Sequence, residues 1–135
     1  MARKSISQYP ADWPAIAHET KVAAGWRCVR CGHAHDPAAG YTLTVHHLTM
    51  DPANCRWWNL AALCQRCHLH IQGKVVMERI WYLPHSAWFQ PYAAGYYAHL
   101  HGLPDDREFV ARYADELIAI GQGRMDIEAL RMITD

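Results

Sequence analysis

Apolar and polar residues alternate along the chain with different periods in different segments. From Asp12, a typical helix N-cap, apolar residues recur every three to four positions, which predicts a short amphipathic helix ending at Gly25. Residues 41–46 alternate and are rich in β-branched and aromatic types, which predicts a strand. The apolar run 60–63 predicts a second short strand, and a helix is expected to start near residues 64–67.

The second half of the chain favours helices. Aromatic residues are dense from 81 to 97, and we expect them to form core more than a base-stacking surface. Residues 104–108 predict a helix start, and apolar residues at helical spacing follow until Gly121. A last helical turn or two is expected over residues 126–133.

Length and composition allow one domain with a proper core, since the chain has 135 residues and 51% of them are hydrophobic. We therefore expect a single α+β domain over residues 1–135. It would contain an N-terminal helix, a ββα core over residues 26–80 and a helical extension over residues 81–135 that packs on this core.

Charge is balanced over the whole chain but is unevenly distributed. Residues 1–103 hold nine Lys and Arg against five Asp and Glu, and residues 104–135 hold four against eight. The basic excess of the first part is a mild indication of a nucleic-acid partner. No stretch approaches about 18 consecutive apolar residues, and no apolar segment follows the basic N-terminus. These features predict a soluble cytoplasmic protein that does not bind a membrane.

Five cysteines suit a metal site better than a disulfide framework. Four of them form two C-x-x-C pairs, which predict one structural Zn²⁺ bound by four thiolates. These residues are Cys28, Cys31, Cys64 and Cys67. A site that combines the second pair with His68 and His70 would be crowded and would leave the first pair without a role, and a redox C-x-x-C is a weaker alternative. Cys55 is expected to be a packing or surface residue.

Three short motifs follow one another between residues 45 and 68, and the last of them contains the second C-x-x-C pair. They are Val45-His46-His47-Leu48, Asn59-Leu60 and Leu63-Cys64-Gln65-Arg66-Cys67-His68. In this order they resemble the HNH endonuclease family, the nucleases with a ββα-metal finger, in its zinc-stapled form. The resemblance covers residues 26–74 or so. It implies a metal-dependent hydrolase that cleaves phosphodiester bonds in DNA and leaves 5′-phosphate and 3′-hydroxyl ends.

The resemblance also implies a role for each matching residue. His47 would be the general base, and His46 and His68 would bind one catalytic divalent cation. Asn59 would be a structural support that orients His47, and Gln72 would be a third contact of the cation. Imidazole ligands leave the cation open among Mg²⁺, Mn²⁺, Ni²⁺, Co²⁺ and Zn²⁺.

The chemistry agrees with such a division of roles. Phosphodiester hydrolysis needs a base for the water, a cation for the phosphate charge and a group that holds the base in place. Histidine suits the base because its ordinary pKa of about 6.5 leaves it largely neutral near pH 7. Adjacent strand residues point to opposite faces, so His46 and His47 cannot both have the same role at one site.

Basic side chains near the predicted finger are candidates for phosphate contacts, with solvated surface as the alternative. They are Arg30, Arg56, Arg66 and Lys74. The paired Trp57 and Trp58 are expected in the core. A catalytically silent zinc finger that binds nucleic acid or protein is the main alternative function, and a nuclease for RNA or structured DNA is a third. The sequence leaves open the specificity, the oligomeric state, a dimer included, and a phage or mobile-element setting.

Overall fold

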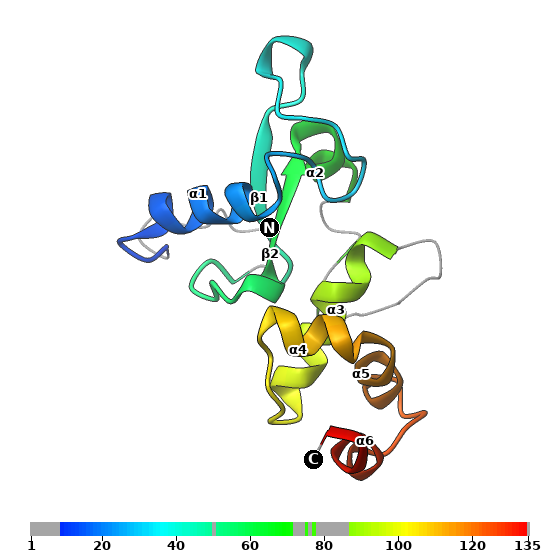
Figure 1. Cartoon of the computed structure of the whole chain (residues 1–135). Coiled ribbons are helices and arrows are strands. Elements are labelled where there is room, and N and C mark those ends of the chain that lie inside the picture. The colour runs from blue at the N-terminus through cyan, green and yellow to red at the C-terminus, as the bar shows by residue number, and fades with distance from the viewer. Residues whose placement is uncertain (1–8, 50, 72–74, 76, 78–86, 135) are drawn as a thin grey trace. The chain divides into compact units, whose positions relative to one another are not determined.

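The chain divides into two compact units in a computed structural model (Figure 1), Met1–Ile80 and Trp81–Asp135. The structure describes residues 9–49, 51–71, 75, 77 and 87–134. The predicted α+β class is confirmed, because a two-stranded antiparallel sheet is combined with helices. Packing of the helical extension on the predicted ββα core stays a prediction.

The first unit contains one helix before the sheet and one directly after it. Helix α1 (Trp13–Ala23) confirms the first predicted helix, although the Asp12 side chain makes no capping hydrogen bond. Strand β1 (Leu43–His47) pairs with β2 (Leu60–Cys64), and α2 (Gln65–Ile71) starts at the next residue. The first strand begins two residues later than predicted. The described part of this unit also contains the short 3-10 helices η2 (Pro37–Ala39) and η3 (Trp57–Asn59).

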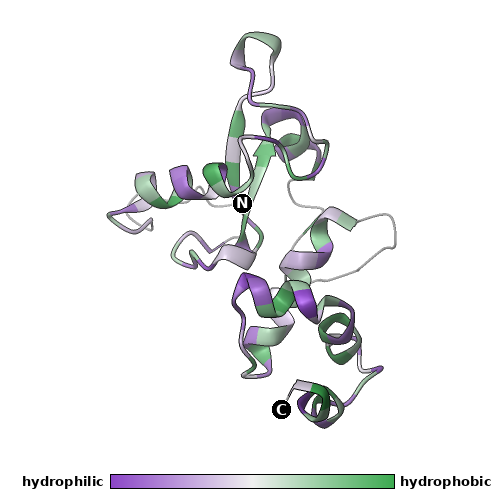
Figure 2. Ribbon diagram, viewed as in Figure 1, coloured by the Kyte–Doolittle hydropathy of each residue, from purple (hydrophilic) through white to green (hydrophobic). Residues whose placement is uncertain are grey.

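Strand β2 is the centre of this unit. All five of its residues are buried, and Figure 2 shows the strand as hydrophobic. The backbone N–H of Val29 donates to Ala62 O at 2.9 Å, which attaches the first cysteine turn to the strand. Strand β1 pairs with β2 so that Leu43 lies opposite Cys64 and His47 lies opposite Leu60. Helix α1 packs against both strands.

The described part of the second unit, residues 87–134, is helical. Its elements are η5 (Ala87–Phe89), α3 (Gln90–Leu100), α4 (Arg107–Arg112), α5 (Ala114–Gly121) and α6 (Ile127–Thr134). The single helix predicted up to Gly121 is two helices, because the backbone at Tyr113 (φ −119°, ψ 27°) leaves the helical range. The predicted start is confirmed, since the Asp106 carboxylate accepts from Phe109 N at 3.2 Å. The last helix is confirmed over Ile127–Thr134.

Small residues bring α3 and α5 together. Ala94 and Ala98 of α3 are fully buried, and a Cβ at Gly121 would lie 2.2 Å from Tyr97 Cδ2. Only glycine fits there without a shift of the ring. Of the described residues of the aromatic run, Phe89 is buried, and the half-buried ones are Trp88, Tyr92, Tyr96 and Tyr97. Among the described helices, none has both the length and the apolar character of a membrane span.

Candidate metal centre and histidine site

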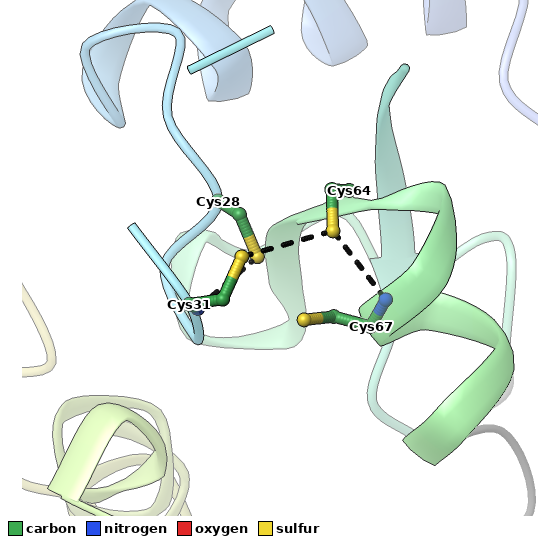
Figure 3. Close-up of side chains that lie close together, drawn as sticks. All are labelled: Cys28, Cys31, Cys64 and Cys67. Atoms are coloured by element: carbon green, nitrogen blue, oxygen red, sulfur yellow. Dashed lines mark hydrogen bonds between the residues drawn. The ribbon is translucent and has the colours of Figure 1, made fainter. Parts of the chain in front are cut away.

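Four cysteine side chains converge in the first unit (Figure 3). Cys28 and Cys31 come from the turn after α1, Cys64 ends β2, and Cys67 lies in α2. Their sulfur atoms all lie within 4.8 Å of one another, and Cys31 Sγ is 3.8 Å from Cys64 Sγ. A tetrahedral zinc ion with Zn–S bonds of about 2.3 Å separates its sulfurs by about 3.8 Å. The structure thus brings the four predicted ligands together in a cluster that can hold a metal ion.

Each C-x-x-C segment folds as a turn around its first sulfur. Cys31 N donates to Cys28 Sγ at 3.4 Å, and Cys67 N donates to Cys64 Sγ at 3.4 Å. Gly32, with φ +78°, closes the first turn in a left-handed conformation that glycine adopts without strain. The backbone N–H groups aimed at Cys28 Sγ favour the thiolate form of that residue, which is the form that binds metals.

The thiols respond unequally to their shared surroundings. Burial raises the pKa of Cys28, but backbone hydrogen bonds from Cys31, Cys64 and Arg30 outweigh it and lower the value to about 7. Burial raises the pKa of Cys67 to about 12, and its sulfur neighbours add to the rise although Arg30 opposes it. Several thiolates cannot share this small volume unless a cation compensates their charge.

A second group of potential ligands lies between β1 and α2. His46 Nδ1 is 3.1 Å from His68 Nε2, and Thr44 Oγ1 is 2.8 Å from His68 Nδ1. The same hydroxyl donates its one hydrogen to Leu63 O at 2.7 Å, so it accepts from His68 Nδ1–H. That leaves His68 Nε2 with its lone pair directed toward His46. Thr44 therefore fixes the tautomer in which His68 can bind a metal through Nε2.

The histidine pair fits a divalent cation in spacing and in protonation. Two nitrogen ligands at about 2.1 Å from one ion, with an angle between about 90° and 110°, lie about 3.0–3.4 Å apart. Burial, and then the charges of His68 and His47, lower the pKa of His46 to about 4. Burial also lowers the pKa of His68. Both imidazoles are consequently neutral near pH 7, as metal binding requires.

The histidine pair is an incomplete ligand set within the part of the chain that is described. No third His, Cys, Asp or Glu joins the two imidazoles among those residues. Gln72, predicted as a further contact, lies outside the described residues, as does Lys74. His70 is exposed, as expected for a residue two positions from His68. A cation here would keep positions open for water and substrate, unlike an ion in the cysteine cluster.

His47 points away from this pair. Its ring lies 4.7 Å from the Trp13 ring and 5.7 Å from the Tyr9 ring, centroid to centroid. The side chain is only 8% exposed. The two consecutive histidines thus serve different faces of β1, as alternation along a strand requires.

Asn59 is completely buried and ties down the loop after β1. Its Oδ1 accepts from Thr49 N at 2.7 Å, and its Nδ2 donates to Asn54 O at 2.8 Å. The backbone N–H of Leu48 also donates to Asn59 O at 2.9 Å. The amide therefore fixes the conformation of the segment that directly follows the two histidines.

Two of the described basic side chains predicted to contact phosphates, Arg30 and Arg66, have other partners as well. Arg30 donates to Cys67 Sγ at 3.3 Å. Arg66 donates to Gly40 O and to Ala39 O, with its guanidinium 4.4 Å from the Tyr41 ring centre. Arg56 is exposed.

Cys55, the two adjacent tryptophans and Thr44 lie in the same unit as the two sites. Cys55 lies outside the cluster and its thiol donates to Pro52 O at 3.6 Å, as expected of a packing residue. Trp58 is buried, whereas Trp57 is half-buried. Thr44 was missed, although it lies two residues before His46 and so shares its face of the strand.

The chain was also compared with known proteins. No family model, curated protein or solved structure matches it. Its function must accordingly be inferred from the donor atoms, distances and burial described above.

Proposed function

We propose that this protein is a metal-dependent endonuclease of the HNH type, which hydrolyses phosphodiester bonds in DNA. The observation that carries the proposal is the approach of His46 Nδ1 and His68 Nε2 to 3.1 Å, with both imidazoles neutral, beside a separate cluster of four cysteines. A chain with one structural metal site has no need of a second, open set of imidazole ligands. The order β1, β2, α2 supports a ββα-metal finger.

The cysteine cluster would hold a structural Zn²⁺. Its four sulfurs complete a tetrahedral site, so they leave no position for substrate. The ligands come from the end of β2, from α2 and from the turn hydrogen-bonded to β2. Zinc there would fasten α2 to the sheet and so hold His68 beside His46.

His46 and His68 would bind the catalytic cation. When bound, a divalent cation supplies positive charge to the phosphate and to the leaving 3′ oxygen. Thr44 keeps His68 in the tautomer that presents Nε2, and the hydrogen-bonded strands hold His46 in place. Gln72 is a candidate for a third contact.

His47 would accept a proton from the attacking water. In-line displacement places the entering and leaving oxygens on opposite sides of phosphorus. A base on one face of β1 and metal ligands on the other suit a phosphate that lies across the end of the strand. Asn59 would support this geometry by holding the loop that follows His47.

Plasmid cleavage with a panel of divalent cations tests the proposal. We expect Mg²⁺, Mn²⁺, Ni²⁺, Co²⁺ or Zn²⁺ to support cleavage by the wild type. His47→Ala should keep zinc and fold but lose about 10²–10⁴-fold in rate, the usual contribution of a general base. His70→Ala is the matched control, because His70 is an exposed histidine of the same helix and its loss should not change the rate. A His47→Ala protein with full activity would refute the assigned base.

The burial of His47 favours a second candidate, a catalytically silent zinc module that binds nucleic acid or protein. A side chain that is 8% exposed gives water little access to the imidazole. Absence of cleavage with every cation, together with DNA binding that survives replacement of His46 and His47, would support this second candidate.

A further inference from the structure

Two aromatic rings lie against the proposed general base, one from Trp13 at the start of α1 and one from Tyr9 in the segment before that helix. The Trp13 ring lies 4.7 Å from the His47 ring at an interplanar angle of 34°, and Tyr9 meets His47 edge-on at 5.7 Å and 63°. The two aromatic rings also contact each other at 5.2 Å. His47 Nε2 has essentially no exposed surface. Trp13 and Tyr9 thus form a wall beside the imidazole, and we refer to them as the aromatic pair.

The backbone fixes the position of Trp13. Trp13 is the first residue of α1, and its N–H donates to Pro10 O at 3.0 Å. Asp12 O accepts from Ala15 N and Ile16 N, at 3.0 and 3.1 Å. Helix α1 in turn packs against β1, the strand that carries His47. The indole therefore has a defined place relative to the imidazole.

A base of this kind needs a fixed orientation. The imidazole can turn about two side-chain torsions, and a turn about either moves its nitrogens away from a water that it must deprotonate. A flat indole tilted only 34° from the ring restricts such rotation by contact over the face. The Asn59 amide bonds to the backbone of the following loop, so it does not restrict these torsions directly.

We propose that Trp13 is a positioning residue for His47: its indole holds the imidazole in the orientation in which the imidazole accepts the proton of the attacking water. This inference rests on the proposed nuclease function. Trp13 would not touch the substrate's reacting atoms and would act only through His47. Tyr9 completes the wall by contacting both rings.

The test compares substitutions at Trp13 in the full chain. Trp13→Phe keeps a flat ring, whereas Trp13→Leu keeps an apolar side chain but no ring. Ile16→Ala is the matched control, because it removes apolar volume from the next turn of α1 and leaves the aromatic pair in place. Cleavage of plasmid gives kcat and KM, and zinc content and thermal unfolding report the fold. The rate of His47 carbethoxylation, located by peptide mass, measures how well the aromatic pair shields the imidazole and does not depend on activity.

We expect kcat of Trp13→Leu to fall by about 10²-fold, as for a misplaced catalytic group, with KM nearly unchanged. Trp13→Phe should recover most of this loss, and Ile16→Ala should cleave like the wild type. His47 should be modified faster in Trp13→Leu than in the wild type or Trp13→Phe.

Two results overturn the inference alone. One is a zinc-loaded Trp13→Leu protein with wild-type kcat, and the other is a loss in Trp13→Phe as large as in Trp13→Leu. A wild type that cleaves nothing with any cation refutes the proposed function, and the inference falls with it. The behaviour of the wild type therefore separates the two failures.

Discussion

Replacing Asn59 by alanine should destabilise the first unit strongly. Its amide makes two short hydrogen bonds, at 2.7 Å from Thr49 N and at 2.8 Å to Asn54 O, from a fully buried position. Each such bond contributes about 1 kcal/mol, and each partner left unpaired inside the protein costs about 1–3 kcal/mol. Thr49 and Asn54 are half-buried, so water can reach them in part. We therefore expect a loss of about 2–4 kcal/mol.

This loss can be measured by denaturant unfolding of the zinc-loaded protein, followed by tryptophan fluorescence. Asn54→Ala is the matched control. Its side chain makes one long, exposed hydrogen bond, from Arg56 N at 3.3 Å, and its substitution keeps the backbone carbonyl that Asn59 uses. This control should stay within about 0.5 kcal/mol of the wild type, as surface changes do.

Asn59→Asp gives a further check on the reasoning. A carboxylate can still accept from Thr49 N, but it cannot donate to Asn54 O and would face it with like charge. The aspartate should therefore be at least as destabilising as the alanine. An Asn59→Ala protein that loses less than about 0.5 kcal/mol would refute the structural role of this amide.

Three other outcomes follow from the two ligand sets. Cys64→Ser, or removal of zinc by a chelator, should unfold the first unit in circular dichroism; a fully folded Cys64→Ser protein in EDTA would contradict the structural metal. Without a second cation, the free energy of unfolding should fall as pH drops from about 6.5 to about 4, because the folded pKa of His46 is the lower one and the unfolded chain binds the proton first. This loss of stability is roughly 3 kcal/mol at most and should be missing in His46→Gln. Identical pH profiles of the unfolding free energy in the wild type and in His46→Gln would disprove it. Thr44→Val should weaken Mn²⁺ binding about 10–100-fold by calorimetry, because His68 Nδ1–H loses its acceptor, and unchanged affinity would contradict that role.

The sequence predicted those parts of the molecule that local chemistry determines. Two C-x-x-C pairs limit where their sulfurs can lie, and the four cysteines do converge. Alternation along a strand predicted that His46 and His47 lie on opposite faces, and His46 lies against His68 whereas His47 lies against Trp13. The apolar run 60–63 also indicated strand β2, and the helix after it starts within the range 64–67 that was expected.

The parts that were missed depend on contacts between distant segments. The contact of Trp13 with His47 joins residues 34 positions apart in the sequence, and the pattern of α1 gives no indication of it. The bounds of helix α3 could not be predicted from the sequence. Its buried face consists of alanine and glycine between aromatic residues, so the apolar periodicity is weak. The helix break at Tyr113 likewise could not be predicted, because no glycine or proline occurs there.

The pairing of β1 with β2 has a consequence for insertions and deletions. A shift of one residue in an antiparallel pair turns every side chain to the other face. Such a shift would exchange His46 and His47, so that the proposed base would face His68 and the proposed ligand would face Trp13. Cys64 lies opposite Leu43 and belongs to the cysteine cluster, so the cluster fixes the register of the strand pair as well as the position of the strands. We consequently expect a single-residue insertion between residues 43 and 46 to abolish the proposed cleavage of DNA even if the protein still binds zinc.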